Sequence, residues 1–189
     1  TMGSPETEAE RETNEGPPHS VTIQNGCWMS KYEVTQGQWE AVMDTNPAHT
    51  YGVGVNVPVY YLSWDDIQLF LGETDNQLRL PTEAEWEYAC RSGGKSEAYC
   101  GGESVDRLAW HHGNSGEQTH PVGTKAANGL GLYDMSGNVW EWCLDLPGPY
   151  EEAEAVEGEE DPAGALVRHL LDMPSPPEDL PDCAYGCWE

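Results

Sequence analysis

The chain has 189 residues and a formal net charge of −26, because 34 acidic residues stand against only eight Lys and Arg. That length is enough for one domain with its own hydrophobic core, and the 21 Gly and 14 Pro favour a loop-rich fold over a helical bundle. The charge argues against a nucleic-acid partner, since phosphate binding needs clustered Lys and Arg, and no apolar stretch approaches the roughly 18 residues of a membrane span.

The acidic residues are concentrated in two stretches. Five glutamates lie between residues 6 and 15, and seven acidic residues lie between residues 151 and 161. Such runs are typical of solvated, flexible segments. A salt-adapted surface is the alternative, suggested by the scarcity of lysine.

Three short helices are predicted, each by a hydroxyl residue three positions before an acid or amide. These pairs are Thr35 with Gln38, Ser63 with Asp66, and Thr82 with Glu85. The first and third match the capping box, and the second is a near match. Apolar residues follow each cap at helical spacing: Trp39, Val42 and Met43; Ile67, Phe70 and Leu71; Trp86, Ala89 and Cys90. Each pattern predicts a helix that packs on a shared core.

Strand signals are shorter and weaker. Residues 20–23 alternate in polarity, and residues 28–34 are placed to pair with them across the turn dipeptide Asn25-Gly26. Residues 57–62 form another candidate strand, which Pro58 restricts to a sheet edge or a loop.

The second half of the chain is poorer in regular patterns. Residues 93–128 are rich in Gly, Ser, His and Asn, which predicts long ordered loops. After residue 145 the texture changes to an acidic run, a short apolar stretch at 166–173 and a proline-rich end. We therefore divide the single domain into a core at 1–145 and a divergent C-terminal segment at 146–189.

The segment 131–142 is the most informative part of the chain. It contains two Trp, a Tyr, two carboxylates, an Asn and two Gly within twelve residues. The aromatic side chains favour burial, whereas Asp134 and Glu141 can be buried only if something pairs with them. An irregular loop that folds around a cation reconciles these demands.

Together with residues 79–89, this segment resembles the formylglycine-generating enzyme (sulfatase-modifying factor) family. The resemblance continues in the expected order through residues 2–6, 19–23, 31–35, 57–59, 62–64, 121–123 and 128. It implies an α+β fold class, in the form of a C-type-lectin-like fold that is rich in loops, with short helices and small antiparallel sheets.

Members of this family have different functions, so the resemblance leaves function open. Some members are copper-dependent oxidases that convert a sulfatase cysteine to formylglycine, and others form sulfur–carbon bonds with iron. Still others are non-catalytic binding or display proteins, including proteins diversified by retroelements.

The catalytic motifs of the family are absent from this chain. In the oxidases, the copper thiolates follow an Arg-Gly-Gly-Ser-Trp/Tyr motif and precede a Gly-Phe-Arg motif, and neither motif occurs here. Cys183 and Cys187 are separated by three residues, whereas the catalytic pair has four between. Two thiolates are suitable ligands for Cu(I). A copper-dependent oxidase that uses this pair is therefore the alternative to a non-catalytic module.

The resemblance also implies a structural Ca²⁺ site. The family's second calcium site corresponds to the side chains of Asp134 and Glu141 and to the backbone carbonyls of Gly137 and Val139. Oxygen ligands of this kind suit a hard cation. The alternative is that Asp134 caps a turn and Glu141 pairs with an arginine such as Arg79. No match to the family's first calcium site is recognisable at residues 108–112.

The six cysteines are even in number, as in proteins of oxidising compartments, and no Cys-x-x-Cys pair suggests zinc. In the resembling enzymes, the cysteine at the position of Cys90 pairs with one in the C-terminal segment. Cys183 or Cys187 is the expected partner here, with free thiols or metal ligation as the other possibilities.

The histidines are not expected to form a metal site. His19, His111, His112 and His120 lack helical i, i+4 spacing or a nearby acid in a metalloenzyme pattern, so we expect packing or hydrogen-bonding roles. The prediction is an extracytoplasmic binding or display module for a protein or other extracellular ligand, with one structural calcium ion.

Overall fold

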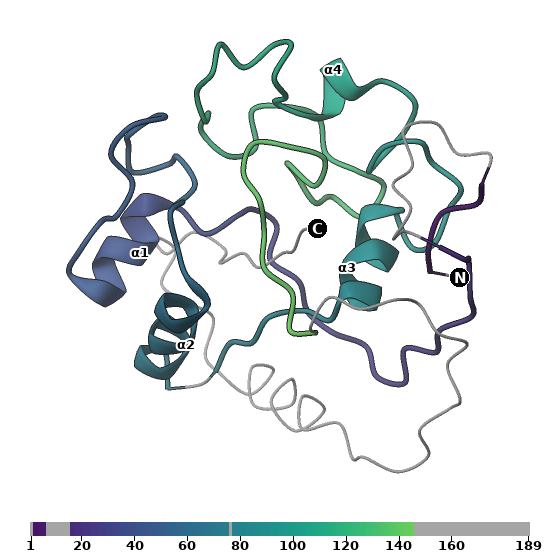
Figure 1. The fold of residues 1–189 in the computed structure, drawn as a ribbon, viewed down its shortest axis with the longest axis horizontal. Coiled ribbons are helices and arrows are strands. Elements are labelled where there is room, and N and C mark those ends of the chain that lie inside the picture. Colours follow the sequence, from purple (N-terminus) through teal and green to yellow (C-terminus); the bar gives the residue numbers. More distant parts are fainter. Residues whose placement is uncertain (1, 7–15, 76, 146–189) are drawn as a thin grey trace.

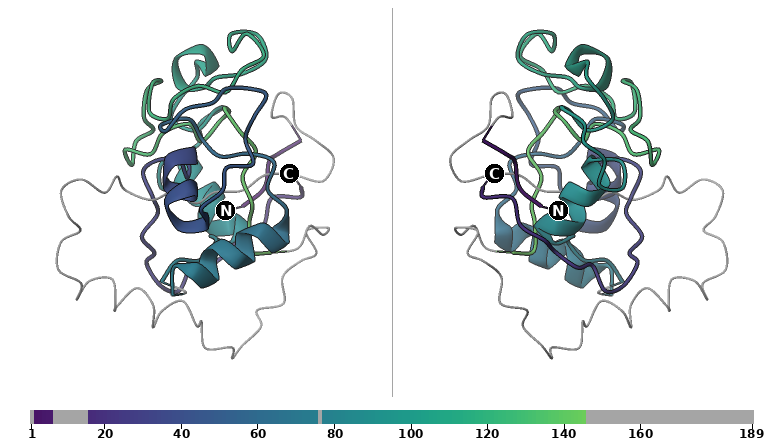
Figure 2. Two further views of the ribbon diagram at one scale, coloured as in Figure 1. Left: turned by 90° about the vertical axis from the view of Figure 1, so that its left-hand side faces the viewer. Right: turned by 90° about the vertical axis from the view of Figure 1, so that its right-hand side faces the viewer.

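The computed structural model of the chain describes residues 2–6, 16–75 and 77–145, in which four helices are joined by long loops (Figure 1). The helices are α1 (Gln36–Met43), α2 (Trp64–Glu73), α3 (Glu83–Cys90) and α4 (Val105–Leu108). Views from two further sides place α4 and its loops at one end of the molecule and α2 at the opposite end (Figure 2). The C-terminal segment 146–189 lies outside the described residues, so the boundary at 145 stays a prediction.

The three predicted capping boxes are all formed. The hydroxyls of Thr35, Ser63 and Thr82 each accept a hydrogen bond from the backbone N–H three residues on, and the side chain at that position accepts one from the backbone N–H of the cap residue. The second pair, predicted as a near match, is complete because the Asp66 carboxylate reaches the Ser63 N–H at 2.8 Å. These caps fix where α1, α2 and α3 begin.

Two apolar clusters form the core. The first lies between α1 and α2, where the rings of Trp39 and Phe70 stack with centroids 4.9 Å apart, and it includes Leu80. The second lies between α3 and the segment 131–142, where Trp86 packs with Leu132. The predicted stripes of all three helices face these clusters, which confirms the helical periodicity.

The predicted hairpin of residues 20–23 and 28–34 is not formed. Among the described residues only isolated antiparallel bridges occur, and they join Met2 to His19, Thr35 to Pro58 and Tyr99 to Gly102. The reason is that backbone groups of the second predicted strand bond elsewhere: the Lys31 carbonyl accepts from Tyr133, and the Val34 carbonyl accepts from Val59. The small sheets therefore stay a prediction. The predicted loops of 93–128 hold one short helix, α4.

Candidate cation site and neighbouring surfaces

The segment 131–142 folds as the predicted irregular loop. Asp134 and Asn138 have left-handed φ values of 61° and 74°, and the Gly137 N–H donates to the Asp134 carbonyl at 3.1 Å. A Cβ at Gly137 would collide with the carbonyl oxygen of Trp110. Glycine is needed there for close approach, and the loop is fixed against the Trp110 backbone.

Asp134 is the most buried carboxylate of this loop, with only 2% of its surface exposed. Its Oδ2 accepts a hydrogen bond from the Gly123 N–H at 2.7 Å, whereas its buried Oδ1 has no hydrogen-bond partner among the described residues. Burial raises the pKa of this carboxyl group, and the bond from Gly123 only partly offsets that effect. An unpartnered carboxylate oxygen in such a place is costly unless a cation or water meets it.

Glu141 is held in a similar environment. Its Oε2 accepts a hydrogen bond from the indole N–H of Trp86 at 2.7 Å. Desolvation, and to a lesser degree the charge of Asp134, raises the pKa of Glu141 to about 8, although the Trp86 bond lowers it. The alternative pairing with Arg79 is wrong, because Arg79 forms a bidentate pair with Glu85 at 2.7 and 2.8 Å.

A third carboxylate, Glu33, was missed by the sequence analysis. It is 5% exposed, and it accepts hydrogen bonds from the Asn138 side chain at 2.8 Å and the Val139 N–H at 3.2 Å. Its pKa is raised well above the ordinary value by burial and then by the charges of Glu141 and Asp134. The available signal was a lone carboxylate between Tyr32 and Val34, immediately before a capping box.

The loop offers a hard cation two kinds of oxygen ligand, side-chain carboxylates and backbone carbonyls. Desolvation raises the pKa of all three carboxyl groups; the charge of Asp134 adds to this at Glu141, and the charges of Glu141 and Asp134 add to it at Glu33. Among the described residues no Lys or Arg forms an ion pair with any of the three. Within that part of the chain no three His, Cys, Asp or Glu side chains converge on a common metal position. A cation at Asp134 and Glu141 would therefore need the carbonyls of Gly137 and Val139 as further ligands. The calcium site remains a prediction.

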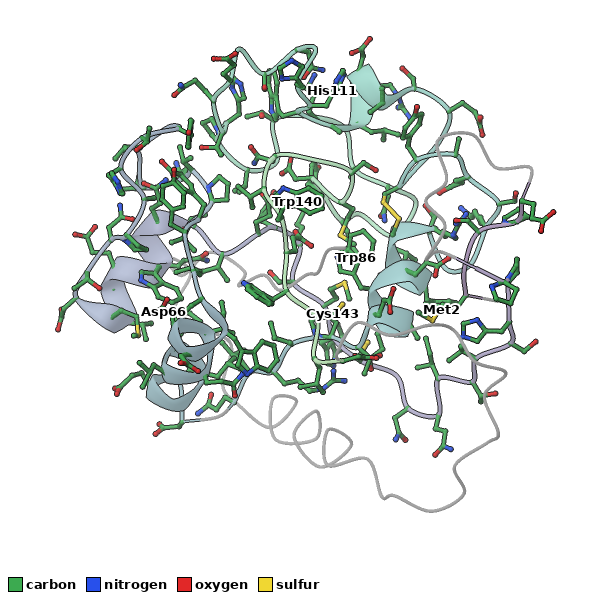
Figure 3. All side chains as sticks on the ribbon, viewed as in Figure 1. Met2, Asp66, Trp86, His111, Trp140 and Cys143 are labelled. Carbon is green, nitrogen blue, oxygen red and sulfur yellow. A yellow bond between two sulfur atoms is a disulfide. The ribbon has the colours of Figure 1, made fainter. Side chains whose placement is uncertain are left out.

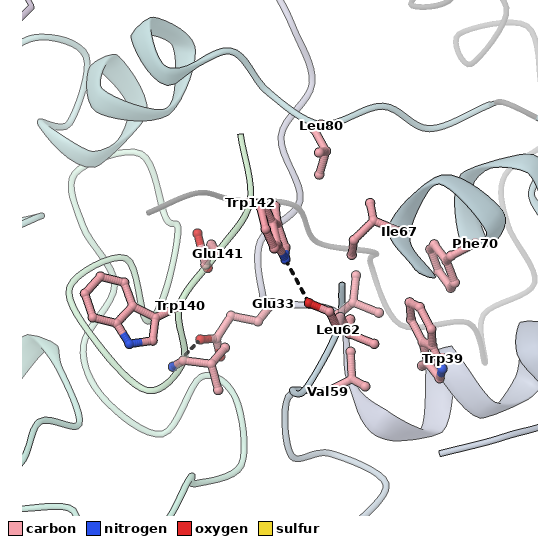
Figure 4. A pocket seen from close by; sticks show the side chains of 12 residues that line it. Glu33, Trp39, Val59, Leu62, Ile67, Phe70, Leu80, Trp140, Glu141 and Trp142 are labelled. Carbon is pink, nitrogen blue, oxygen red and sulfur yellow. Dashed lines mark hydrogen bonds between the residues drawn. The ribbon is translucent and has the colours of Figure 1, made fainter. Parts of the chain in front are cut away.

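An apolar pocket of about 70 Å³ lies between this loop and the core around α1 and α2 (Figure 4). Glu33 and Glu141 line it on one side, and Ile67 and Phe70 line the other. The indole N–H of Trp142 donates to the Leu62 carbonyl at 3.3 Å and holds the edge of the pocket. The space is far smaller than the roughly 300 Å³ of a small-molecule site, so we assign it no ligand.

Packing or hydrogen-bonding roles were predicted for four histidines, and the structure shows such contacts for His111 and His120. His111 lies 2.8 Å from the Asp106 carboxylate, and His120 stacks on Trp110 with ring centroids 3.7 Å apart. The Lys125 Nζ lies over the Trp110 ring, 4.0 Å from its centroid. This cluster borders the segment 131–142, because the Trp110 carbonyl accepts from the Asn138 N–H at 2.8 Å and the His120 N–H donates to the Asn138 side chain at 2.9 Å. Figure 3 labels His111 of the cluster and Trp140 of the segment.

The predicted disulfide partner of Cys90 is wrong. Cys90 pairs with Cys100, with Cα atoms 4.5 Å apart, because the turn that follows α3 brings the chain back within reach after ten residues. Cys143 is also disulfide-bonded, and Cys27 is a free thiol. Cys183 and Cys187, the pair of the copper alternative, lie outside the described residues.

A group of aromatic and apolar side chains is exposed on the loop between α1 and α2. The ring centroids of Tyr60 and Tyr61 are 5.0 Å apart, those of Tyr51 and Tyr61 are 6.1 Å apart, and His49 lies 5.5 Å from Tyr61. We call this group the tyrosine surface and define it by His49, Tyr51, Val53, Val55, Tyr60 and Tyr61. Four of its members are between 47% and 70% exposed, which is unusual for side chains of this size grouped together.

Comparison with known proteins places these features in a family context. Residues 1–165 match a family model described as the sulfatase-modifying factor enzyme 1-like domain. A protein of Paenibacillus barcinonensis named chaperone protein LppX is 35% identical over 180 aligned positions, which cover 67% of this chain and 64% of that protein. The formylglycine-generating enzyme of Streptomyces coelicolor is 36% identical over 118 positions, 54% of this chain and 37% of the enzyme.

The comparison of structures agrees with the comparison of sequences. Treponema denticola variable protein 1 has a structure similar to this one, with a TM-score of 0.64, 27% sequence identity and coverage of 81% of this chain and 71% of that chain. The chain spans between about a third and two thirds of the length of the two sequence relatives.

Proposed function

Because the chain belongs to the family of sulfatase-modifying factor enzyme 1-like domains, we propose that it uses this scaffold as a non-catalytic module for binding or display. The observation that carries the proposal is the tyrosine surface, where large side chains are exposed on a loop that the scaffold holds in place. Rigid aromatic side chains on fixed loops are well suited to recognition, since little conformational entropy is lost on binding.

Two of the similar proteins support a role other than oxidation. The scaffold occurs in a protein named as a chaperone and in one named as a variable protein, as well as in formylglycine-generating enzymes. A chaperone acts on proteins, so that relative favours a protein as the ligand. The disulfide of Cys90 with Cys100 favours an extracytoplasmic location, where thiols are oxidised. No helix among the described residues is long and apolar enough to cross a bilayer.

We assign Ca²⁺ to the loop as a structural ion. Asp134 and Glu141 supply carboxylate oxygens, and Gly137 and Val139 supply carbonyls. The unpartnered Oδ1 of Asp134 is the observation that supports this ligand set. The ion would neutralise desolvated carboxylates that are otherwise forced toward the protonated form.

The alternative is a copper-dependent oxidase that converts a sulfatase cysteine to formylglycine, with Cys183 and Cys187 as the thiolates. The sequence relatives named as formylglycine-generating enzymes favour it. Oxygen consumption by the full chain with Cu(I), a thiol reductant and a cysteine peptide distinguishes the two functions. The proposal expects no uptake beyond that of the same mixture without protein, and uptake that depends on protein, copper and peptide together would contradict it.

A further inference from the structure

The loop that carries the tyrosine surface is held rigidly by one buried side chain. Gln36 is 2% exposed, and its amide nitrogen donates to the carbonyls of Gly52 and Pro58 at 3.0 and 3.1 Å. Its amide oxygen accepts from the Gly54 N–H and from the Asn46 side chain, each at 3.1 Å. All of the hydrogen-bonding groups of this amide are therefore used to fix the loop against α1.

Further contacts fix the rings themselves. The Tyr60 hydroxyl accepts from the N–H groups of Thr50 and Tyr51 at 2.9 and 2.7 Å. The Tyr51 carbonyl accepts from the N–H and the hydroxyl of Thr119, at 2.5 and 2.6 Å. The exposed rings are thus presented by a preorganised backbone, as in other recognition loops.

Tyr61 has an unusual backbone conformation for its residue type. Its φ is 63°, in the left-handed region that favours glycine, and its side chain is 55% exposed. An aromatic residue at such a φ is strained, and an exposed ring gains little from burial in return. Strain that the surrounding contacts maintain in this way is typical of functional positions.

The stretch of chain that carries this surface has charges of one sign. From residue 32 to residue 78 the chain has seven acidic residues and no Lys or Arg. Most of these acids are exposed, including Glu40 and Asp44 at the end of α1 and Asp65 in the first turn of α2. Four cations of the described part are engaged within the molecule: Arg79 with Glu85, Arg91 with Glu87, and Lys31 and Lys125 over aromatic rings.

We infer that the tyrosine surface binds an arginine-containing segment of a partner protein. Exposed tyrosine faces attract guanidinium groups through cation–π contacts and stacking, and the acidic residues on either side add long-range attraction. Arginine is favoured over lysine because its planar group stacks on a ring while it donates hydrogen bonds outward. The inference rests on the proposed binding function and specifies the surface and the partner chemistry. A second copy of this chain is disfavoured by the charge of −26.

The test uses the full chain and a blocked arginine–glycine repeat peptide, with matched peptides that carry lysine or the neutral isostere citrulline instead. Double substitution of Tyr51→Ala and Tyr61→Ala should weaken arginine-peptide binding by about tenfold, since two exposed cation–π contacts are lost. Tyr88→Ala is the matched control, because Tyr88 is a tyrosine of similar exposure, 52%, on α3. It should leave binding unchanged.

Two further measurements keep the inference open to contradiction. The double variant Glu40→Gln and Asp65→Asn should bind the arginine peptide more weakly than the double variant Glu103→Gln and Asp106→Asn at α4, although both pairs change the net charge equally. In the unmutated chain, the methyl resonances of Val53 and Val55 should shift on titration with the arginine peptide, so the result does not depend on a variant folding.

Equal losses for the surface and control variants would show diffuse electrostatic attraction and would overturn the inference. So would binding of the citrulline peptide as tight as that of the arginine peptide, or unshifted valine methyls. None of these results would bear on the proposed non-catalytic function, whose failure would appear as oxygen uptake with a cysteine peptide.

Discussion

At the scale of single residues, the most unusual feature is a group of three desolvated carboxylates, Glu33, Asp134 and Glu141, which form no ion pair with a Lys or Arg in the part of the chain that the structure describes. Asp134→Asn keeps the shape of the side chain and removes its charge, so we expect Ca²⁺ affinity to fall by at least about tenfold. The rise in melting temperature on adding calcium should shrink with it. Asp106→Asn is the control, because Asp106 is exposed and bonds to His111 away from the loop.

If calcium raises the melting temperature of the Asp134→Asn variant as much as that of the unmutated chain, then Asp134 is not a ligand. Loss of the effect in the Asp106→Asn control would likewise count against the assignment, because it would show that calcium acts through diffuse surface charge.

The same residues predict how stability depends on pH without calcium. The folded-state pKa of Glu141 is raised from 4.5 to about 8, and those of Glu33 and Asp134 are raised too. The folded chain then binds protons that the unfolded chain has released. The stability from these groups is present below the unfolded pKa and is lost as pH rises through the folded pKa.

With calcium chelated, the free energy of unfolding from urea titrations should therefore fall between about pH 5 and pH 8, a direction that follows from the raised pKa values. Glu141→Gln should make the fall shallower. A free energy of unfolding that rises over this range would mean that the carboxylates are not held toward the protonated form.

Residue roles could be predicted from the sequence only where a motif carried them. Asp134 and Glu141 belong to a segment whose composition predicts a cation or a counter-charge beside its carboxylates. The structure buries Asp134 and half-buries Glu141, and neither forms an ion pair with a Lys or Arg of the described residues. Glu33 could not be found in this way. Its role depends on bonds to Asn138 and Val139, more than one hundred residues along the chain, and no local pattern encodes such a contact.

At the scale of secondary-structure elements, capping chemistry fixes where the helices begin. Thr82→Ala removes a hydroxyl that accepts from the Glu85 N–H, so α3 should lose about 1 kcal/mol of stability. Ser104→Ala is the matched control, since Ser104 occupies the same position before α4 but makes no side-chain cap bond. It should cost less than about 0.5 kcal/mol. Equal losses in chemical denaturation would contradict the capping account.

The helices could be predicted because caps and apolar stripes are local signals, and the structure confirms all three. The hairpin was wrong for the opposite reason. A short strand is decided by its hydrogen-bonding partners, and the Lys31 and Val34 carbonyls bond to Tyr133 and Val59 rather than to the neighbouring turn. The predicted partner of Cys90 was wrong as well. Cys100 lies close to Cys90 after the turn that follows α3, and Cys90 pairs with it rather than with the C-terminal cysteine that the resemblance implied.

At the scale of the whole molecule, membership of the family fixes the scaffold but does not fix the function. The match over residues 1–165 establishes the scaffold, yet the relatives that share it carry different names and are longer than this chain. The features on which the proposed binding function rests are the exposed tyrosines and the acidic charge, which are properties of the surface rather than of the core. Function must therefore be tested directly on the surface and on the chemistry.

The most direct test of the central claim, a non-catalytic module on this scaffold, is the fate of a cysteine substrate. A Cys-x-Pro-x-Arg sulfatase peptide is incubated with the full chain, Cu(I), a thiol reductant and oxygen, beside an active formylglycine-generating enzyme as the control, and is analysed by mass spectrometry. We predict an unchanged peptide wherever the control enzyme has converted its own. The mass loss of formylglycine at the cysteine, abolished by Cys183→Ser or Cys187→Ser, would contradict the claim.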